Sequence, residues 1–238
     1  MARAQLEPAY VLHRRPYRET SLLIEALSRG HGRVGLVARG ALGERSRLRA
    51  ALQPVRPLLL SWSGRHDLMT LTGAEATGRP PLEGHRLLAG LYLNELLIRL
   101  LPRLDPHPTV YDAYANALAD LTRDDDEETV LRVFEKRLLE ALGYGMVLGG
   151  RDCTGRPLDP ERTYRYQVET GPVPDDHTAD GVAVRGATLL AVAEERIPDR
   201  LLAREAKQLM RYVLRHYLGD RPLQSRSLFQ RPGSKRAT

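Results

Sequence analysis

The chain has 238 residues, and its 42% of hydrophobic and 28% of charged residues are typical of a globular protein with one or two domains. No window approaches the roughly 18 apolar residues that a membrane-spanning helix needs. The first eight residues lack the apolar run of a signal peptide, and the single cysteine, Cys153, excludes an internal disulfide, so we expect a cytoplasmic protein.

The first third of the chain is a series of short β-prone segments. In the clearest of them, Val34, Leu36 and Ala38 form one side of a two-residue alternation, which is the period of a half-buried strand. The other expected strands lie at 10–12, 20–27, 58–62 and 68–72. Several short strands so close together favour a small β-barrel, which we expect to have five strands within residues 6–78.

The pattern changes at Arg79-Pro80-Pro81, where two prolines end any strand. Helical spacing of apolar residues then predicts helices at 88–100, 111–121, 129–142 and 199–218. A Gly-, Pro- and Asp-rich stretch at about 146–185 predicts an irregular insert with one or two short strands near 164–168. The predicted class is therefore α+β, with a barrel domain at 1–80, a helical domain carrying the insert at 81–238, and a disordered tail from about residue 230.

Charge is unevenly distributed along the chain, whose formal net charge is +6. Residues 1–80 hold 13 arginines and six acidic residues, and residues 196–238 hold 11 lysines and arginines and three acidic residues. The segment between them is acidic. Basic ends of this kind favour binding to a polyanion, with a solvated surface as the alternative.

The first candidate surface is a basic face of the barrel. Alternation along a strand puts Arg33 and Arg39 on the same side, away from the core. The arginines of residues 40–50 would also share one direction if that segment is extended. The cations that we expect to contact DNA phosphates here are Arg14, Arg15, Arg33, Arg39, Arg45, Arg47 and Arg49.

Single-strand binders combine such a cationic groove with aromatic rings on which bases stack. Near these cations the pattern offers Tyr10, Tyr17 and Trp62, with Arg18 adjoining Tyr17. The alternative is that Tyr10 and Trp62 are core aromatics and that the arginines form a solvated face.

A second candidate surface lies on the last expected helix. At about 100° per residue, five cations fall within an arc of roughly 80°, opposite an apolar face. They are Arg200, Arg204, Lys207, Arg211 and Arg215. We take Arg204, Lys207 and Arg211 as candidates for contact with DNA. A protein partner, pairing with the acidic middle of the chain and a solvated helix are the alternatives.

Catalytic motifs are missing from the sequence. It has no GxxxxGK[ST] loop for a nucleoside triphosphate, no HExxH and no CxxC. The run Asp124 to Asp126 would point in different directions on a loop, so a helix-capping or solvated role is favoured over the two-metal centre of a nuclease. We therefore expect no enzymatic activity, no cofactor and no bound metal.

Several blocks of residues keep a characteristic order over nearly the full chain. They include Val11-Leu12-His13, Arg15-Pro16-Tyr17, Gly32-Arg33-Val34, Asn94-Glu95-Leu96-Leu97, Leu142-Gly143-Tyr144-Gly145, Thr163-Tyr164-Arg165-Tyr166 and Ser225-Arg226-Ser227-Leu228-Phe229. No single block is diagnostic, but together they resemble the RecO family of DNA repair proteins.

The resemblance implies an N-terminal OB-fold barrel and a C-terminal helical domain. It implies DNA repair and recombination through binding of single- and double-stranded DNA, annealing of complementary strands, and help in loading the RecA recombinase onto DNA coated with single-stranded-DNA-binding protein. It also implies a nucleoid-associated location. Some family members hold zinc with four cysteines in the insert, but Cys153 stands alone here, so no zinc is expected.

The implied protein partners are RecR and the acidic, apolar-ended C-terminal tail of the single-stranded-DNA-binding protein. For the terminal carboxylate of that tail we take Arg132 as the first candidate cation and Arg137 as the second. The alternative is that Arg132 merely pairs with Glu128, one helical turn away. The predicted function is a non-enzymatic recombination mediator, and the alternative is an RNA-binding or ribosome-associated OB-fold protein.

Overall fold

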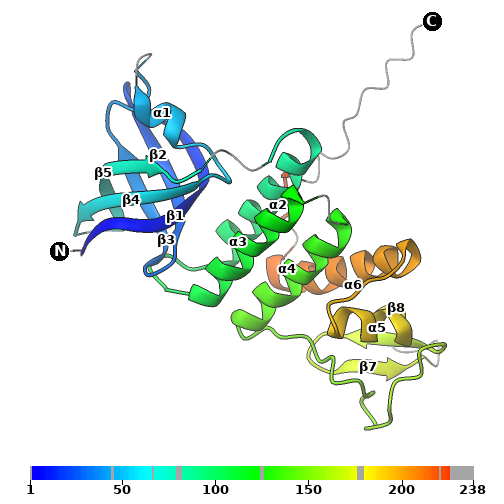
Figure 1. Ribbon diagram of the computed structural model, residues 1–238. Coiled ribbons are helices and arrows are strands. Elements are labelled where there is room, and N and C mark those ends of the chain that lie inside the picture. The colour runs from blue at the N-terminus through cyan, green and yellow to red at the C-terminus, as the bar shows by residue number, and fades with distance from the viewer. Residues whose placement is uncertain are drawn as a thin grey trace, which may run out of the picture. The chain divides into compact units, whose positions relative to one another are not determined.

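The computed structural model describes residues 2–43, 46–65, 67–78, 82–123, 126–175, 180–219 and 221–225. The chain divides into two compact units, one of residues 1–122 with 222–238 and the other of residues 123–221. Figure 1 shows the barrel and helices α2 and α3 in the first unit, and α4 to α6 with a small sheet in the second. None of the described helices has the length and apolar character to span a membrane.

A closed five-stranded barrel forms the N-terminal part of the first unit, in the order β1-β2-β3-β5-β4. Its strands are β1 (Ala2–Tyr17), β2 (Ser21–Ser28), β3 (Gly32–Ala38), β4 (Pro57–Gly64) and β5 (Leu68–Ala76). All neighbours are antiparallel except β3 and β5, which pair in parallel over only three residues. The alternating side chains of Ile24, Leu36, Leu60 and Trp62 fill the interior. The predicted five-stranded, OB-like barrel and the α+β class are confirmed.

Residues 47–51 are not extended, which was the condition for their arginines to share one direction. They form a short helix, α1 (Arg47–Ala51), which continues into a hydrogen bond of 2.9 Å from the Leu52 amide to the Leu48 carbonyl. The reason is packing, because Leu52 is fully buried and Leu48 packs against the barrel core. On a helix, residues four apart lie on the same face, so Leu48 and Leu52 both reach the barrel core.

Two helices complete the first unit, α2 (Gly84–Leu100) and α3 (Pro108–Thr122). The Tyr10 ring of β1 packs edge-on against Tyr114 of α3, with ring centroids 5.1 Å apart. Asn94 of α2 donates to the Leu12 carbonyl of β1 at 2.9 Å and accepts from the Tyr114 hydroxyl at 2.5 Å. Burial raises the pKa of Tyr114 well above its ordinary value, so its hydroxyl remains a donor.

The second unit contains α4 (Glu127–Ala141), α5 (Gly186–Ala193) and α6 (Arg200–Leu218). Asp199 caps α6 by accepting from the amides of Leu201 and Leu202, and Gly219, with φ 69°, ends it. The helices expected at 88–100, 111–121, 129–142 and 199–218 are thus α2, α3, α4 and α6.

The insert is more regular than the sequence predicted. Three strands, β6 (Thr163–Gln167), β7 (Gly171–Pro174) and β8 (Val182–Arg185), form an antiparallel sheet in the order β7-β6-β8. Tyr164 and Tyr166 of the central strand are buried, which gives this short sheet a core of its own. The domain boundary near residue 80 stays a prediction, and the tail from residue 230 lies outside the described residues.

Candidate nucleic-acid interface

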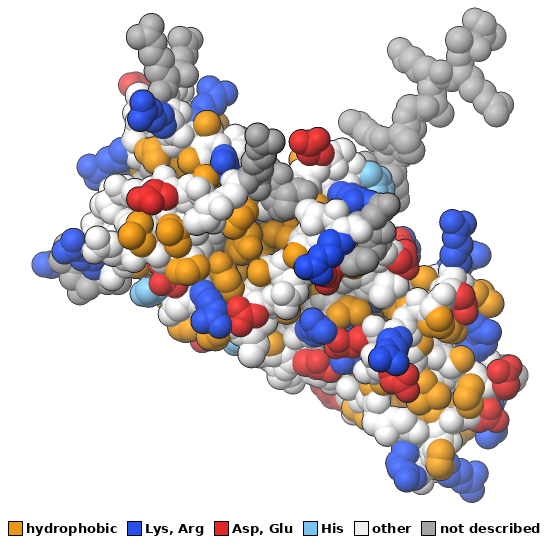
Figure 2. Space-filling model, in the orientation of Figure 1, with side chains coloured by type: hydrophobic (Ala, Val, Ile, Leu, Met, Phe, Trp, Pro, Cys, Tyr) orange, Lys and Arg blue, Asp and Glu red, His pale blue; other side chains and the backbone are white. Residues whose placement is uncertain are grey.

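Surface charge alone does not mark a binding site on this protein. Figure 2 shows Lys and Arg side chains interspersed with Asp and Glu over the face that it draws. A site must therefore be located from the geometry of particular side chains.

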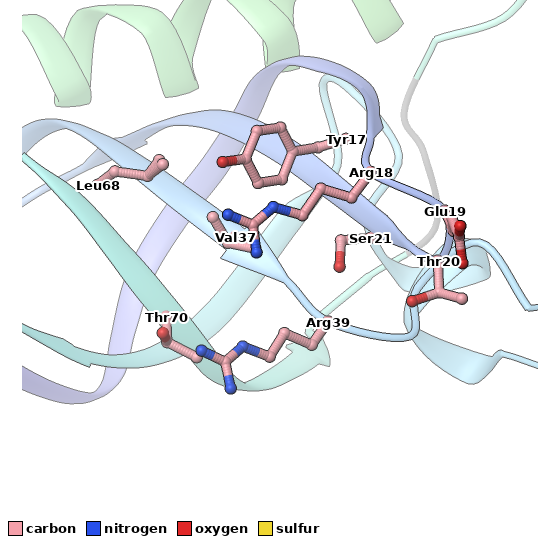
Figure 3. Close-up of a pocket in the computed structure, with 9 residues that line it drawn as sticks. All are labelled: Tyr17, Arg18, Glu19, Thr20, Ser21, Val37, Arg39, Leu68 and Thr70. Atoms are coloured by element: carbon pink, nitrogen blue, oxygen red, sulfur yellow. The ribbon is translucent and has the colours of Figure 1, made fainter.

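A groove of about 660 Å³ opens on the outside of the barrel, between the β1–β2 turn, the end of β3 and the start of β5. Its lining includes Tyr17, Arg18, Ser21, Val37, Arg39, Leu68 and Thr70. The three-residue pairing of β3 with β5 brings Val37 directly beside Thr70. In Figure 3 the side chains of Arg18 and Arg39 extend in the same direction, Arg18 beside the Tyr17 ring and Arg39 toward Thr70.

Two turns hold the groove's cations. Arg18 lies in the β1–β2 turn with φ 54°, a left-handed conformation that is uncommon for a residue with a side chain. Arg39 directly follows β3 and precedes Gly40, whose φ of 68° is natural for glycine. The Leu42 amide donates to the Thr20 carbonyl at 2.9 Å, so the two turns are joined. Backbone strain at an exposed arginine is a feature that proteins concentrate at functional sites.

The groove combines positive charge, an aromatic ring and apolar surface. The Arg18 guanidinium lies 5.2 Å from the centroid of the half-exposed Tyr17 ring, within the range of a cation–π contact. Leu68 is 38% exposed and Val37 is partly exposed. Guanidinium groups suit phosphates, and a ring beside an apolar floor suits a nucleic-acid base.

The structure separates the predicted barrel arginines into free and internally bonded ones. Within the described residues, the exposed side chains of Arg15, Arg39, Arg47 and Arg49 make no hydrogen bond or ion pair. Arg14, by contrast, donates to the Arg49 carbonyl at 2.9 Å and to Gln53 at 2.8 Å. Arg45 lies outside the described residues.

The Arg33 side chain is also bound by other groups of the protein. It pairs with Glu25 at 3.1 Å and donates to the Leu101 carbonyl at 3.0 Å, and its side chain is only 16% exposed. The common direction of Arg47 and Arg49 depended on an extended segment and does not hold, because residues two apart on the helix α1 point about 200° apart.

Two of the three predicted stacking residues are in the core. Trp62 is 1% exposed inside the barrel, and Tyr10 is 8% exposed against the tyrosines of α3. The alternative reading of these rings as core aromatics is therefore correct. Only Tyr17 reaches the surface of the groove.

On α6 the predicted cationic stripe is exposed except at its centre. Arg200, Arg204, Arg211 and Arg215 are exposed, whereas Lys207 is half-buried and pairs with Glu128 of α4. Within the described residues, no partner is found for the side chains of Arg204 and Arg211. Pairing with the acidic middle of the chain thus occurs at Lys207.

The two candidate cations for a partner's tail both have partners of their own. Arg132 is 4% exposed and pairs at 2.8 Å with Glu135, which is fully buried. The acid that pairs with Arg132 is therefore not Glu128, which was the alternative partner. Arg137, 43% exposed, donates to both carboxylate oxygens of Glu195. Burial leaves Arg132 inaccessible in this arrangement.

Sequence patterns do not identify the other groove residues as a site. Arg18 offers a usable signal, because it is a cation between Tyr17 and Glu19 in a tight turn. Leu68 and Thr70 carry no local signal at all, because only the β3–β5 pairing brings them beside Val37 and Arg39.

The insert turn that carries Cys153 is held by a carboxylate. One oxygen of Asp152 accepts hydrogen bonds from the Thr154 amide at 2.8 Å, the Thr154 hydroxyl at 2.6 Å and the Arg156 amide at 3.1 Å. No cluster of three or more potential metal-ligating side chains is found in the described part of the chain.

Comparison with known proteins identifies the family. The family models described as "Recombination protein O N terminal" and "Recombination protein O C terminal" match residues 1–79 and 81–227. The chain belongs to the RecO family.

Similar proteins named DNA repair protein RecO extend over nearly the whole chain. The relative from Nitrosococcus oceani is 49% identical over 230 residues, covering 96% of this chain and 94% of the relative. Those from Methylococcus capsulatus and Coxiella burnetii are 48% and 45% identical, covering 96% and 95% of this chain and 94% and 98% of theirs. The resemblance to the RecO family inferred from the sequence is confirmed.

Proposed function

We propose that this RecO-family chain acts in DNA repair and recombination by binding single-stranded DNA in the barrel groove. The observation that carries the proposal is the pair of arginines in one groove, Arg18 beside the Tyr17 ring and Arg39 toward Thr70, together with the apolar side chains of Val37 and Leu68 (Figure 3). A strand would lay its phosphates on the guanidiniums and one base against the ring. The role is binding rather than covalent chemistry, because phosphate contacts and stacking need no catalytic group.

The phosphate contacts can be tested through their salt dependence. For single strands, each contact contributes about 0.7 to the slope of log affinity against log salt. The double variant Arg18→Gln/Arg39→Gln should therefore flatten the slope by about 1.4. The control Arg162→Gln/Arg196→Gln removes the same charge from exposed positions of the other unit. Equal slopes in wild type and the groove variant would refute the groove as the DNA site.

The stacking contact needs a separate test. Tyr17→Ala should cost about 1–3 kcal/mol of affinity for single-stranded DNA, the usual contribution of one stacked base. Tyr17→Phe keeps the ring and should bind as the wild type does. If both variants bind equally well, Tyr17 carries no base and the groove acts through charge alone.

We further propose that the chain binds duplex DNA, anneals complementary strands, and helps to load RecA together with RecR. Since no nucleotide-binding loop exists in the sequence, annealing should proceed without ATP hydrolysis. The exposed cations of α6, Arg204 and Arg211, supply a second surface for a strand. Annealing of labelled complementary oligonucleotides, with and without ATP, tests this.

For the tail of the single-stranded-DNA-binding protein, the favoured cation is now Arg137. It is the more exposed of the two candidates, and a terminal carboxylate could displace Glu195 from it. Loss of a charge-assisted bond costs about 1.5–3 kcal/mol, so Arg137→Gln should weaken the binding of a fluorescent tail peptide roughly tenfold or more. A change in affinity of less than twofold would mean that the tail binds at another site.

The alternative function is RNA binding, because the groove's contacts to phosphate and base would also accept RNA. Competition between DNA and RNA strands of equal length and sequence distinguishes the two. Preference for RNA would overturn the assignment to DNA.

A further inference from the structure

The outer face of β2 and β3 is divided into an open half and a covered half. The open half is the groove, at the Val37 and Arg39 end of β3. At the other end, the connection between α2 and α3 lies against β3: Arg103 forms a β-bridge with Arg33, and the Leu104 amide donates to the Arg33 carbonyl at 2.9 Å. Figure 1 shows this connection reaching the barrel beside β3.

A single carboxylate, that of Glu25, binds the arginines on the covered half of the face. Glu25 of β2 binds Arg33 at 3.1 Å and also binds the Arg103 guanidinium through both of its oxygens. Glu25 lies directly across from Gly35 in the β2–β3 register. A Cβ atom at Gly35 would sit 3.1 Å from the Asp67 carbonyl oxygen and 3.3 Å from the centre of the Arg103 guanidinium, so the missing side chain lets Arg103 approach the strand closely.

The part of β3 covered by the α2–α3 connection directly adjoins the groove. Gly35 pairs with Leu68, a groove residue, on the neighbouring strand β5. The charged groups that face this point are Glu25, Arg33, Arg103 and Asp67, the last of which contributes its charge to the surroundings of Arg103. Arg33, which alternation puts on the same side of β3 as Arg39, and Arg103 of the α2–α3 connection are thus both bound by Glu25.

We propose that Glu25 restrains Arg33 and Arg103 and so confines single-stranded DNA on the barrel to the groove half. This inference rests on the proposed function of the groove. From Gly35 to Arg39 the strand rises only about 13 Å, which is room for about four nucleotides even at the close spacing of a duplex strand. A contact this short leaves the flanking bases free to pair with a complementary strand.

The test is a gain of DNA contacts in Glu25→Gln. This variant removes the charge that holds both arginines, so the slope of log affinity against log salt for oligo-dT should steepen by about 0.7–1.4, one or two added phosphates. Glu75→Gln is the matched control, because Glu75 is exposed on β5 of the same barrel and loses the same charge. Its slope should equal that of the wild type.

A second variant keeps the proposal testable if Glu25→Gln folds poorly. Arg103 does not contact DNA in the proposed restrained state, so Arg103→Gln should leave the wild-type slope unchanged. A slope lowered by about 0.7 would mean that Arg103 already binds phosphate and would overturn the inference. A folded Glu25→Gln with the wild-type slope would overturn it as well.

The two proposals fail in different ways. If the groove variant Arg18→Gln/Arg39→Gln keeps the wild-type slope, the groove is not the DNA site. If that variant flattens the slope but Glu25→Gln does not steepen it, only the restraint by Glu25 is wrong.

Discussion

Asn94 is the buried polar residue whose contacts connect three elements of the first unit. Its amide group bonds the Leu12 carbonyl and the Tyr114 hydroxyl, and it is 2% exposed. Asn94→Ala leaves both of those buried groups without this partner, at about 1–3 kcal/mol each. We expect a clearly lower urea midpoint, whereas Asn116→Ala, at an exposed position on α3, should change little. Equal midpoints would mean that water replaces the amide.

In the insert, Asp152 is likewise a buried polar residue, and it accepts several hydrogen bonds. The Thr154 hydroxyl, followed by backbone amides, holds the pKa of Asp152 below its ordinary value of 3.8. A carboxylate whose pKa is lowered by folding stabilises the folded protein at pH values above its pKa in the unfolded state. This stabilisation is lost as the pH falls through the pKa of the folded state. Asp152→Asn should therefore lower the unfolding midpoint at pH 7, with a difference that shrinks below about pH 4.

The control for that measurement is Asp180→Asn, which removes an exposed carboxylate from the same unit. A difference that does not depend on pH would contradict the role given to the Asp152 charge. Because the turn is closed by hydrogen bonds, dialysis against a chelator should leave the midpoint unchanged. About one zinc per chain after dialysis would overturn the expectation that no zinc is bound.

At the scale of elements, helix α6 carries one cation that pairs within the protein and others that are exposed to solvent. Lys207 pairs with Glu128 of α4, and each side chain of the pair is about one-third exposed. Lys207→Gln should cost about 0.2–1 kcal/mol of stability and leave DNA binding unchanged. Arg204→Gln/Arg211→Gln should do the reverse, flattening the salt slope by up to about 1.4 for single strands. Unchanged slopes in both variants would make the stripe a solvated face.

At the scale of the molecule, the barrel shares a compact unit with α2 and α3. A fragment of residues 1–80 would uncover Tyr10 and deprive the Leu12 carbonyl of Asn94. A fragment of residues 1–122 keeps both contacts, and we expect it to melt at a clearly higher temperature by circular dichroism. Equal melting temperatures would instead support residues 1–80 as an independent domain.

The sequence by itself determined the barrel, the four longer helices and the family. These features rest on local patterns, since alternation identifies a strand such as 34–38 and helical spacing identifies a helix such as 199–218. Trp62 shows the limit of such patterns, because its ring fits a core and a binding surface equally well until its neighbours are known.

Only the tertiary structure decided which cations remain free. Arg33 and Lys207 resemble Arg39 and Arg211 in sequence pattern, yet they are held by Glu25 and Glu128, and Arg132 is held by Glu135. Two of these carboxylates come from another strand or helix, and their approach is set by strand pairing and helix packing. The groove has the same origin, because β5 reaches β3 only through closure of the barrel. Charge pairing depends on distances in space, which the order of residues along the chain does not contain.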